Sequence, residues 1–148
     1  MYRKIVPDVV TERAICDLKE DATARQAAEA MTKENVSAVV VVNEQSNIIG
    51  ILTERDLTRM VVAPGLDSNK ILVGDIMTKN PDTLSPDDSA GDALELMNSR
   101  GYRHLPVVID GKCNAMVSIR DLYSTVKESL EEDIKETEAF IFGDRYGA

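Results

Sequence analysis

The chain has 148 residues and a formal net charge of -9, and 43% of its residues are hydrophobic. This balance is typical of a folded domain and excludes intrinsic disorder. Lys and Arg form no cluster, so neither nucleic acid nor an anionic membrane is an expected partner. The longest apolar run, residues 38–42, is too short to span a bilayer, and the N-terminus lacks the apolar stretch of a signal peptide.

Apolar spacing and turn residues predict the elements of the first half. An extended segment at residues 14–18 precedes a helix, because apolar residues recur at i, i+3, i+4 and i+7: Ala24, Ala27, Ala28 and Met31. The continuous apolar run that follows indicates a strand buried on both faces. A polar turn at residues 43–47, a returning strand at residues 48–52 and a helix starting at Thr53 complete the unit.

The second half repeats this order of elements. Residues 18–31 align with residues 84–97, and residues 50–57 align with residues 115–122. The repeat predicts two β-α-β-β-α units. Each unit holds about 60 residues, which is near the lower limit for independent folding, so the two are expected to share one core.

The second unit opens with an extended segment at residues 81–84. Its first helix is expected to have Ser85 as N-cap and Pro86 as first helical residue. That helix repeats the apolar spacing of the first: Ala90, Ala93, Leu94 and Met97. After a strand and a tight turn at residues 110–112, the second helix is expected to start at Ser118.

An α/β (α+β) fold with four segments follows: residues 11–62 for the first unit, residues 63–74 for a linker, residues 75–126 for the second unit and residues 127–148 for a C-terminal tail. A charged helix from Lys127 to about Phe140 is expected in the tail. Its residues Leu130, Ile134 and Ile141 predict a thin apolar stripe that docks on the body of the protein or on a partner. The apolar run at residues 140–142 likewise needs cover.

The strand-to-helix junctions carry the strongest chemical signal. Residues 50–56 and 115–121 share the pattern small, apolar, apolar, Thr or Ser, any residue, Arg, Asp. A hydroxyl residue at a helix start lies beside free N–H groups that bind phosphate, and an Asp three residues later can accept hydrogen bonds from a ribose. The same Ser/Thr-x-x-Asp pattern is also a capping box, which needs no ligand.

Arg103 and His104 enter the strand of the second unit where the first unit has Ser37 and Ala38. Adjacent strand residues face opposite sides, so side-chain direction alone would not bring both into one pocket. At least one of the two can reach a phosphate. A single histidine is equally well explained as a hydrogen-bonded structural residue.

Catalysis is not expected. One histidine and two separate cysteines, Cys16 and Cys113, supply neither a metal cluster nor a nucleophile with its base. No phosphate-binding glycine loop of the GxxxxGK(S/T) or GxGxxG type occurs. Isolated cysteines are usual in a reducing compartment, which favours the cytoplasm.

The sequence resembles the tandem cystathionine-beta-synthase-type (CBS) domain proteins. The resemblance spans about residues 14–126 and depends on the two repeats, the opening at residues 77–81, the strand at residues 103–107 and the junction at residues 50–56. It implies two repeats packed through their sheets about a pseudo-twofold axis, with two clefts. It also implies a homodimer and an adenosyl ligand: AMP, ADP, ATP, NAD(H) or S-adenosylmethionine, with AMP or ATP favoured.

The resemblance assigns roles to matching residues. Thr53 and Ser118 would touch phosphate, Asp56 and Asp121 would hold ribose, and Thr78 and Thr83 would flank the adenine. Arg103 and His104 match positions that often meet phosphates, Arg55 and Arg120 would face a phosphate or solvent, and Ile51 completes the expected ligand-binding set. Two departures make the cleft with Thr53 and Asp56 the better supported one: the first unit opens with residues 13–17 instead of Met-Thr-x-x-Pro, and Ala115 replaces the glycine of the junction.

Two hypotheses of function follow. The first is a stand-alone nucleotide sensor that regulates a separate partner protein. The second is a ligand-free interaction or scaffold module whose clefts are vestigial, which the capping-box interpretation favours.

Overall fold

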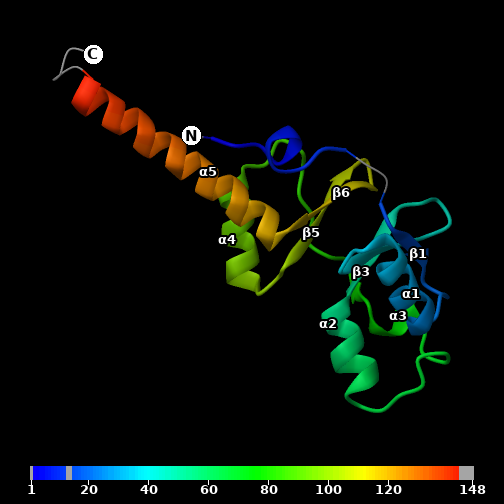
Figure 1. Ribbon diagram of the computed structural model, residues 1–148. Coiled ribbons are helices and arrows are strands. Elements are labelled where there is room, and N and C mark those ends of the chain that lie inside the picture. Colours follow the sequence, from blue (N-terminus) through cyan, green and yellow to red (C-terminus); the bar gives the residue numbers. More distant parts are fainter. Residues whose placement is uncertain (1, 13–14, 144–148) are drawn as a thin grey trace.

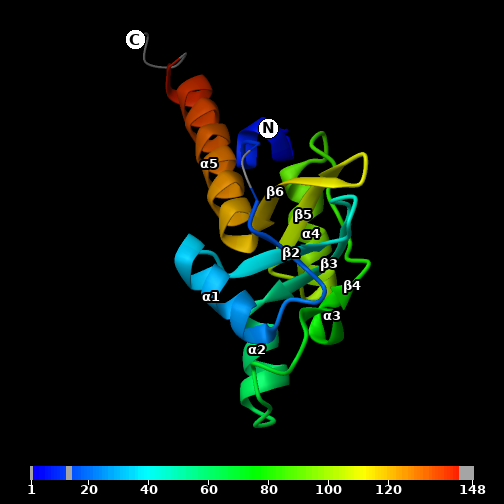
Figure 2. The same ribbon diagram turned by 90° about the vertical axis from the view of Figure 1, so that its right-hand side faces the viewer.

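The computed structural model describes residues 2–12 and 15–143, with side chains as far as Ile141. The apolar residue Phe142 and the end of the predicted tail, residues 144–148, therefore lie outside the described side chains, as do residues 13–14 of the first opening. Figures 1 and 2 show two αβ units joined side by side, with one long helix at the C-terminal end.

The first repeat forms a four-stranded sheet in the order β1-β2-β3-β4. Its strands are β1 (Asp17–Lys19), β2 (Ala38–Val42), β3 (Ile48–Thr53) and β4 (Thr78–Lys79). The first pair is parallel and the others are antiparallel. Every residue of β2 is buried, which confirms the prediction from its continuous apolar run.

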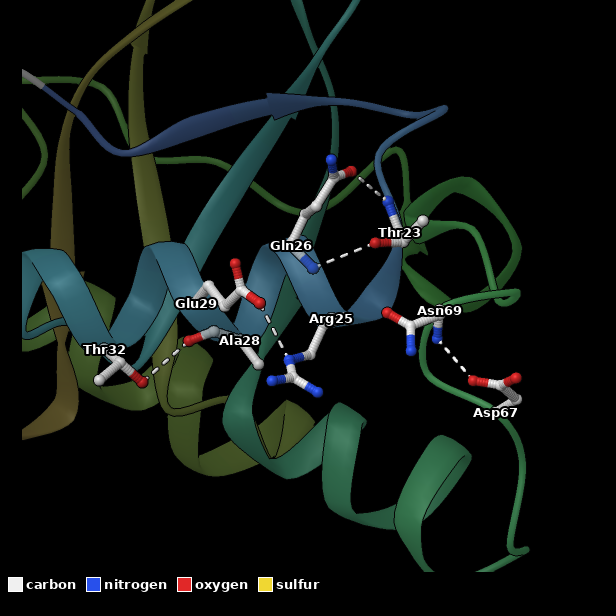
Figure 3. A network of polar contacts seen from close by, with 8 residues as sticks. All are labelled: Thr23, Arg25, Gln26, Ala28, Glu29, Thr32, Asp67 and Asn69. Atoms are coloured by element: carbon white, nitrogen blue, oxygen red, sulfur yellow. Dashed lines mark hydrogen bonds and ion pairs between the residues drawn. The ribbon is translucent and has the colours of Figure 1, made fainter.

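Helix α1 (Ala24–Glu34) starts at a capping box (Figure 3). The Oγ1 atom of Thr23 accepts a hydrogen bond from the Gln26 N–H at 3.1 Å, and Gln26 Oε1 accepts one from the Thr23 N–H at 2.9 Å. The helix ends at Asn35, whose φ of 53° is left-handed. Ala24, Ala27 and Met31 are buried, as their spacing predicts.

The second repeat carries β5 (His104–Ile109) and β6 (Lys112–Ser118) as an antiparallel pair. Its first helix, α4 (Ala90–Arg100), is capped by Ser89, not by Ser85 as predicted. Ser85 and Asp88 instead close a turn of their own, because the Asp88 N–H donates to the Ser85 carbonyl at 3.1 Å and Asp88 Oδ2 accepts from the Ser85 N–H at 2.8 Å. The residues that were predicted to cap the helix therefore form a turn immediately before it.

Two further boundaries differ from the predictions. The expected tail helix does not start at Lys127, because α5 (Ile119–Glu138) runs without a break through that position. The expected opening strand at residues 81–84 is not a strand: β4 lies at Thr78–Lys79 in the first sheet, and Leu84 makes only a single parallel bridge to Val107. The opening segment thus crosses from one repeat to the other.

In the first repeat, α2 (Glu54–Leu57) continues into Thr58–Val62 with right-handed helical backbone at the join. The short helix α3 (Val73–Ile76) begins inside the predicted linker.

Equivalent hydrogen bonds dock a leading segment on each repeat. On the first repeat the Val73 N–H donates to the Ala22 carbonyl at 2.7 Å, and on the second the Ile5 N–H donates to the Asp88 carbonyl at 2.9 Å. The segment that precedes the second repeat therefore packs on the first, while the N-terminal turn Ile5–Val9 packs on the second. This correspondence expresses the pseudo-twofold relation between the repeats.

Each repeat has its own hydrophobic core, so the expectation of one shared core is wrong. One core surrounds Val39 and Leu52, and the other surrounds Val107 and Val117 and includes Ile5 of the N-terminal segment. The docked segments add buried residues that each small unit alone lacks. Val40 and Pro106 are also fully buried but are not members of either core, because alternation along their strands points them away from Val39 and Val107.

Among the described residues, no helix is long and apolar enough to cross a membrane.

Candidate functional site

A cavity of about 960 Å³ opens where the strand-to-helix junctions of the two repeats meet. The β3–α2 junction and the crossing segment after β4 form one wall, and the start of β5 with the β6–α5 junction forms the other. The lining residues are Ser37, Ile51, Thr53, Glu54, Arg55, Asp56, Thr58, Arg59, Thr78, Pro81, Asp82, Gly101, Tyr102, Arg103, His104, Leu105, Ser118, Ile119 and Arg120.

Most of the predicted ligand residues meet at this cavity: Ile51, Thr53, Arg55, Asp56, Thr78, Arg103, His104, Ser118 and Arg120. Thr83 and Asp121 do not line it. Thr83 is exposed beyond β4, after the chain has turned toward the second repeat. Asp121 lies one helical turn inside α5, where its carboxylate caps the helix.

Both junctions form complete capping boxes. Thr53 Oγ1 accepts from the Asp56 N–H at 3.2 Å, and Asp56 Oδ2 accepts from the Thr53 N–H at 2.9 Å. The corresponding distances between Ser118 and Asp121 are 3.1 and 3.0 Å. These bonds need no ligand, yet each hydroxyl keeps its own O–H as a donor and each carboxylate keeps further acceptor positions. The boxes therefore hold these groups in place without exhausting them.

Four arginines surround the cavity: Arg55, Arg59, Arg103 and Arg120. None of them makes an ion pair within the part of the chain that the structure describes. Three carboxylates also line the cavity, and one of them, Asp82, lies 3.9 Å from Arg100 outside it. Guanidinium groups without an ion-pair partner can bind anionic groups, since their planar fork matches phosphate oxygens.

Arg103 and His104 both line the cavity, contrary to the expectation from strand alternation. The reason is that β5 starts only at His104. Arg103 precedes the strand, so the alternation rule does not apply to this pair.

His104 also links the two repeats. Its Nε2 atom lies 2.9 Å from Ser37 Oγ in a partly buried hydrogen bond. Burial lowers the pKa of His104, although the carboxylates of Asp121 and Glu54 oppose this. A neutral imidazole adds no positive charge to the cavity, so electrostatic attraction for an anion comes from the arginines.

The comparisons with known proteins agree with this architecture. The model of the CBS domain family matches residues 6–63 and 73–128. The chain belongs to the CBS domain family. The resemblance inferred from the sequence is thereby confirmed.

Relatives are found in plants and archaea. A mitochondrial CBS domain-containing protein of Arabidopsis thaliana, CBSX3, is 38% identical over 127 residues, covering 83% of this chain and 62% of that protein. An uncharacterized protein of Methanopyrus kandleri is 32% identical over 137 residues, covering 90% of this chain and 70% of its own length. The chain thus spans less than two thirds of the Arabidopsis relative.

Solved structures share the CBS fold. A protein with CBS domains from Burkholderia ambifaria superposes with a TM-score of 0.73 at 33% identity, covering 78% of this chain and 84% of that one. The CBS domain pair of protein MJ0100, solved with 5-methylthioadenosine and S-adenosyl-L-methionine, has a TM-score of 0.75 at 20% identity, covering 87% of this chain and 99% of that one. At that identity the second likeness concerns the fold alone.

Among the lining residues of this CBS module that were not predicted from the sequence, Arg59 and Tyr102 bear most directly on ligand binding. Arg59 lies four residues after Arg55 and so shares a helical face with it, a signal that the spacing contains. Tyr102 follows Gly101, whose left-handed φ of 72° ends α4. A hydrogen bond with Asp82 raises the pKa of the Tyr102 phenol, and the ring supplies an aromatic group to the cavity lining. The described residues contain no group of three or more potential metal ligands.

Proposed function

We propose that this CBS module binds an adenosyl ligand in the cavity and regulates a separate partner protein. The observation that carries the proposal is the set of four unpaired arginines around a cavity of about 960 Å³. Such a volume is within the range of small-molecule sites. The adenosyl ligands of the MJ0100 pair, which has the same fold, support the choice of ligand class.

The proposed roles follow the walls of the cavity. Arg103 and Arg120 bind the phosphate, and the hydroxyls of Thr53 and Ser118 donate to it. Asp56 accepts hydrogen bonds from the ribose through the acceptor positions that its cap leaves open.

The base lies between the two walls. Thr78 and the ring of Tyr102 provide a polar edge and an aromatic face for the adenine. Asp121, the equivalent of Asp56 in the second repeat, does not line this cavity and remains proposed as a ribose acceptor at a second cleft. Thr83 remains proposed at the edge of the adenine site.

Regulation follows from differential binding. Because both repeats line the cavity, a ligand that fits one relative position of the repeats better than another shifts the module toward that state. We propose no chemical turnover of the ligand.

We propose AMP or ATP as the nucleotide and a homodimer as the assembly. The proposed location is the cytoplasm, which the free thiols of Cys16 and Cys113 support.

A thermal-shift panel tests the proposal. AMP, ADP, ATP, NADH and S-adenosylmethionine would be compared with GMP and GTP on the purified full chain. A ligand at about 100 times its Kd stabilises the folded state by about 2.7 kcal/mol, which corresponds to roughly 5–10 °C for a chain of about 150 residues. A shift confined to adenosyl ligands supports the sensor.

The second hypothesis, a scaffold with vestigial clefts, predicts no shift from any of these ligands. It is favoured by the capping boxes, which are complete without a ligand. If the protein is folded and no adenosyl ligand stabilises it, the scaffold hypothesis therefore replaces the sensor hypothesis.

A further inference from the structure

The second half of α5 projects from the body of the protein (Figures 1 and 2). Burial along this helix ends at Ser129, and no described residue from Leu130 to Ile141 is buried. Residues 130–138 of α5 extend about 14 Å at 1.5 Å per residue, and the helical turn Ala139–Gly143 continues them. A helical segment of this length has little stability of its own in water, so a covering partner would stabilise it.

One face of this projecting segment is apolar. Leu130 and Ile134 each keep 57% of their surface exposed, and Ile141 keeps 49%. Tyr123, 53% exposed, lies seven residues before Leu130 on the same face. These four residues, which we name the α5 stripe, lie on a different side of the helix from the buried Leu122 and Ser129, so docking on the body leaves the stripe uncovered.

Acidic residues border the α5 stripe. Residues 127–138 contain two lysines against six carboxylates. Glu131 directly follows Leu130 of the stripe. Glu138 lies seven residues after Glu131, so the two carboxylates lie along the same edge of the stripe. Lys127 approaches Glu131 only at 3.9 Å, between two exposed side chains, a contact that contributes little. This edge therefore remains negative.

The charges decide which occupant fits. A second copy packed stripe to stripe in antiparallel orientation would bring Glu131 and Glu138 toward the same residues of its partner. In parallel orientation Asp133 would approach Glu138 of the other copy. Both arrangements oppose like charges, whereas lysines or arginines beside an apolar stripe would meet opposite charge.

We propose that residues 130–141 are a docking site for an amphipathic basic helix of a partner protein. The partner's apolar side chains cover Leu130, Ile134 and Ile141, and its basic flank faces Glu131 and Glu138. The proposal deepens the proposed function by naming the chemistry of the regulated partner. It does not depend on the cavity, so nucleotide binding and helix docking can fail separately.

The test uses two synthetic 21-residue peptides with leucine at the two core positions of each heptad. One has lysine at the flanking positions and the other has glutamate, and binding of each to the full chain is measured by fluorescence anisotropy at low and high salt. The lysine peptide is expected to bind, and more weakly at high salt. Leu130→Ala with Ile134→Ala is expected to weaken it by at least about tenfold, since burial of each side chain accounts for about that factor.

Two controls make the result specific. Met60→Ala with Val62→Ala removes exposed apolar residues elsewhere (46% and 73% exposed) and should leave binding unchanged. Glu131→Lys with Glu138→Lys should transfer binding from the lysine peptide to the glutamate peptide. The proposal is overturned if neither peptide binds, if both bind alike, or if sedimentation shows a dimer that the Leu130/Ile134 variant dissociates, since the occupant would then be a second copy.

Discussion

Thr53→Ala separates helix capping from ligand binding, because the chain carries a matched cap elsewhere. Thr53 and Thr23 both accept a hydrogen bond from the third residue of their helix, at 3.2 and 3.1 Å, and each belongs to a complete capping box. Only Thr53 lines the cavity. Thr23→Ala (Figure 3) therefore reproduces the loss of the cap without touching the proposed site.

The two effects have different sizes. Loss of a threonine cap costs about 1 kcal/mol, within a range of roughly 0.5–2, so both variants should melt about 2–4 °C lower. A hydrogen bond to a charged group contributes about 1.5–3 kcal/mol, so Thr53→Ala should also weaken nucleotide binding by roughly tenfold to 150-fold. Thr53→Ser, which keeps the hydroxyl, should restore most of that affinity.

Differential scanning calorimetry gives the stability of each variant, and isothermal titration calorimetry gives its affinity for the nucleotide selected by the thermal-shift panel. The expected pattern is equal destabilisation of the two alanine variants with weakened binding in Thr53→Ala alone. Equal destabilisation with unchanged affinity in both would refute the role of the Thr53 hydroxyl in binding and leave it as a cap.

Three further predictions test the cavity and the packing that forms it. A Cβ on Gly50 would lie 2.4 Å from Met77 Sδ and 3.1 Å from the Thr78 carbonyl, so Gly50→Ala should lower the free energy of unfolding by about 1–3 kcal/mol. Gly91 lies in helix α4 with open space around it, so Gly91→Ala should instead raise the free energy of unfolding by about 0.5–1 kcal/mol. Urea titration of both variants measures the two changes. Arg103→Gln and Arg120→Gln should each weaken nucleotide binding about tenfold in calorimetric titration. The control Arg25→Gln should leave binding unchanged, because the Arg25 guanidinium donates to Glu29 outside the cavity. An equal loss of affinity in all three variants would contradict the proposed site. Burial lowers the pKa of His104, so as pH falls through about 6.5 the histidine is protonated in the unfolded state before it is protonated in the folded state. The free energy of unfolding should therefore decrease between pH 7 and 5. Urea titrations of His104→Gln should show a smaller decrease.

The repeat and most of its elements could be predicted from local signals. Helical spacing identified the buried face of α1, and the continuous apolar run identified β2. The start of α4 was predicted wrongly because local sequence does not distinguish Ser85 from Ser89 as its N-cap. The Ala90 N–H donates to the carbonyl of Arg3, which is far away in the chain, and this contact accompanies the start at Ser89. The exchange of leading segments between repeats and the two separate cores depend on similar long-range contacts.

The site was predicted as far as residue type and junction spacing allow. Thr53 and Asp56 were selected from the pattern of the junction, and Arg103 was selected because it matches a position that often meets phosphates in the CBS family. Tyr102 could not be identified, since its place in the cavity wall depends on the left-handed end of α4 at Gly101. The hydrogen bond between Ser37 and His104 joins equivalent regions of the two repeats, and only the packing of one repeat on the other brings these side chains together.

The crossing segment gives the cavity a physical route to regulation. Thr78 belongs to the sheet of the first repeat, whereas Leu84, six residues later, bridges to β5 of the second. Pro81 and Asp82, between them, line the cavity together with both junctions. A ligand in this cavity therefore contacts the chain at the point where it passes between repeats, so its binding free energy depends on their relative position. Since α5 starts at the junction with Ser118 and carries Tyr123, Leu130 and Ile134 of the α5 stripe, a shift of the second repeat moves the stripe with it.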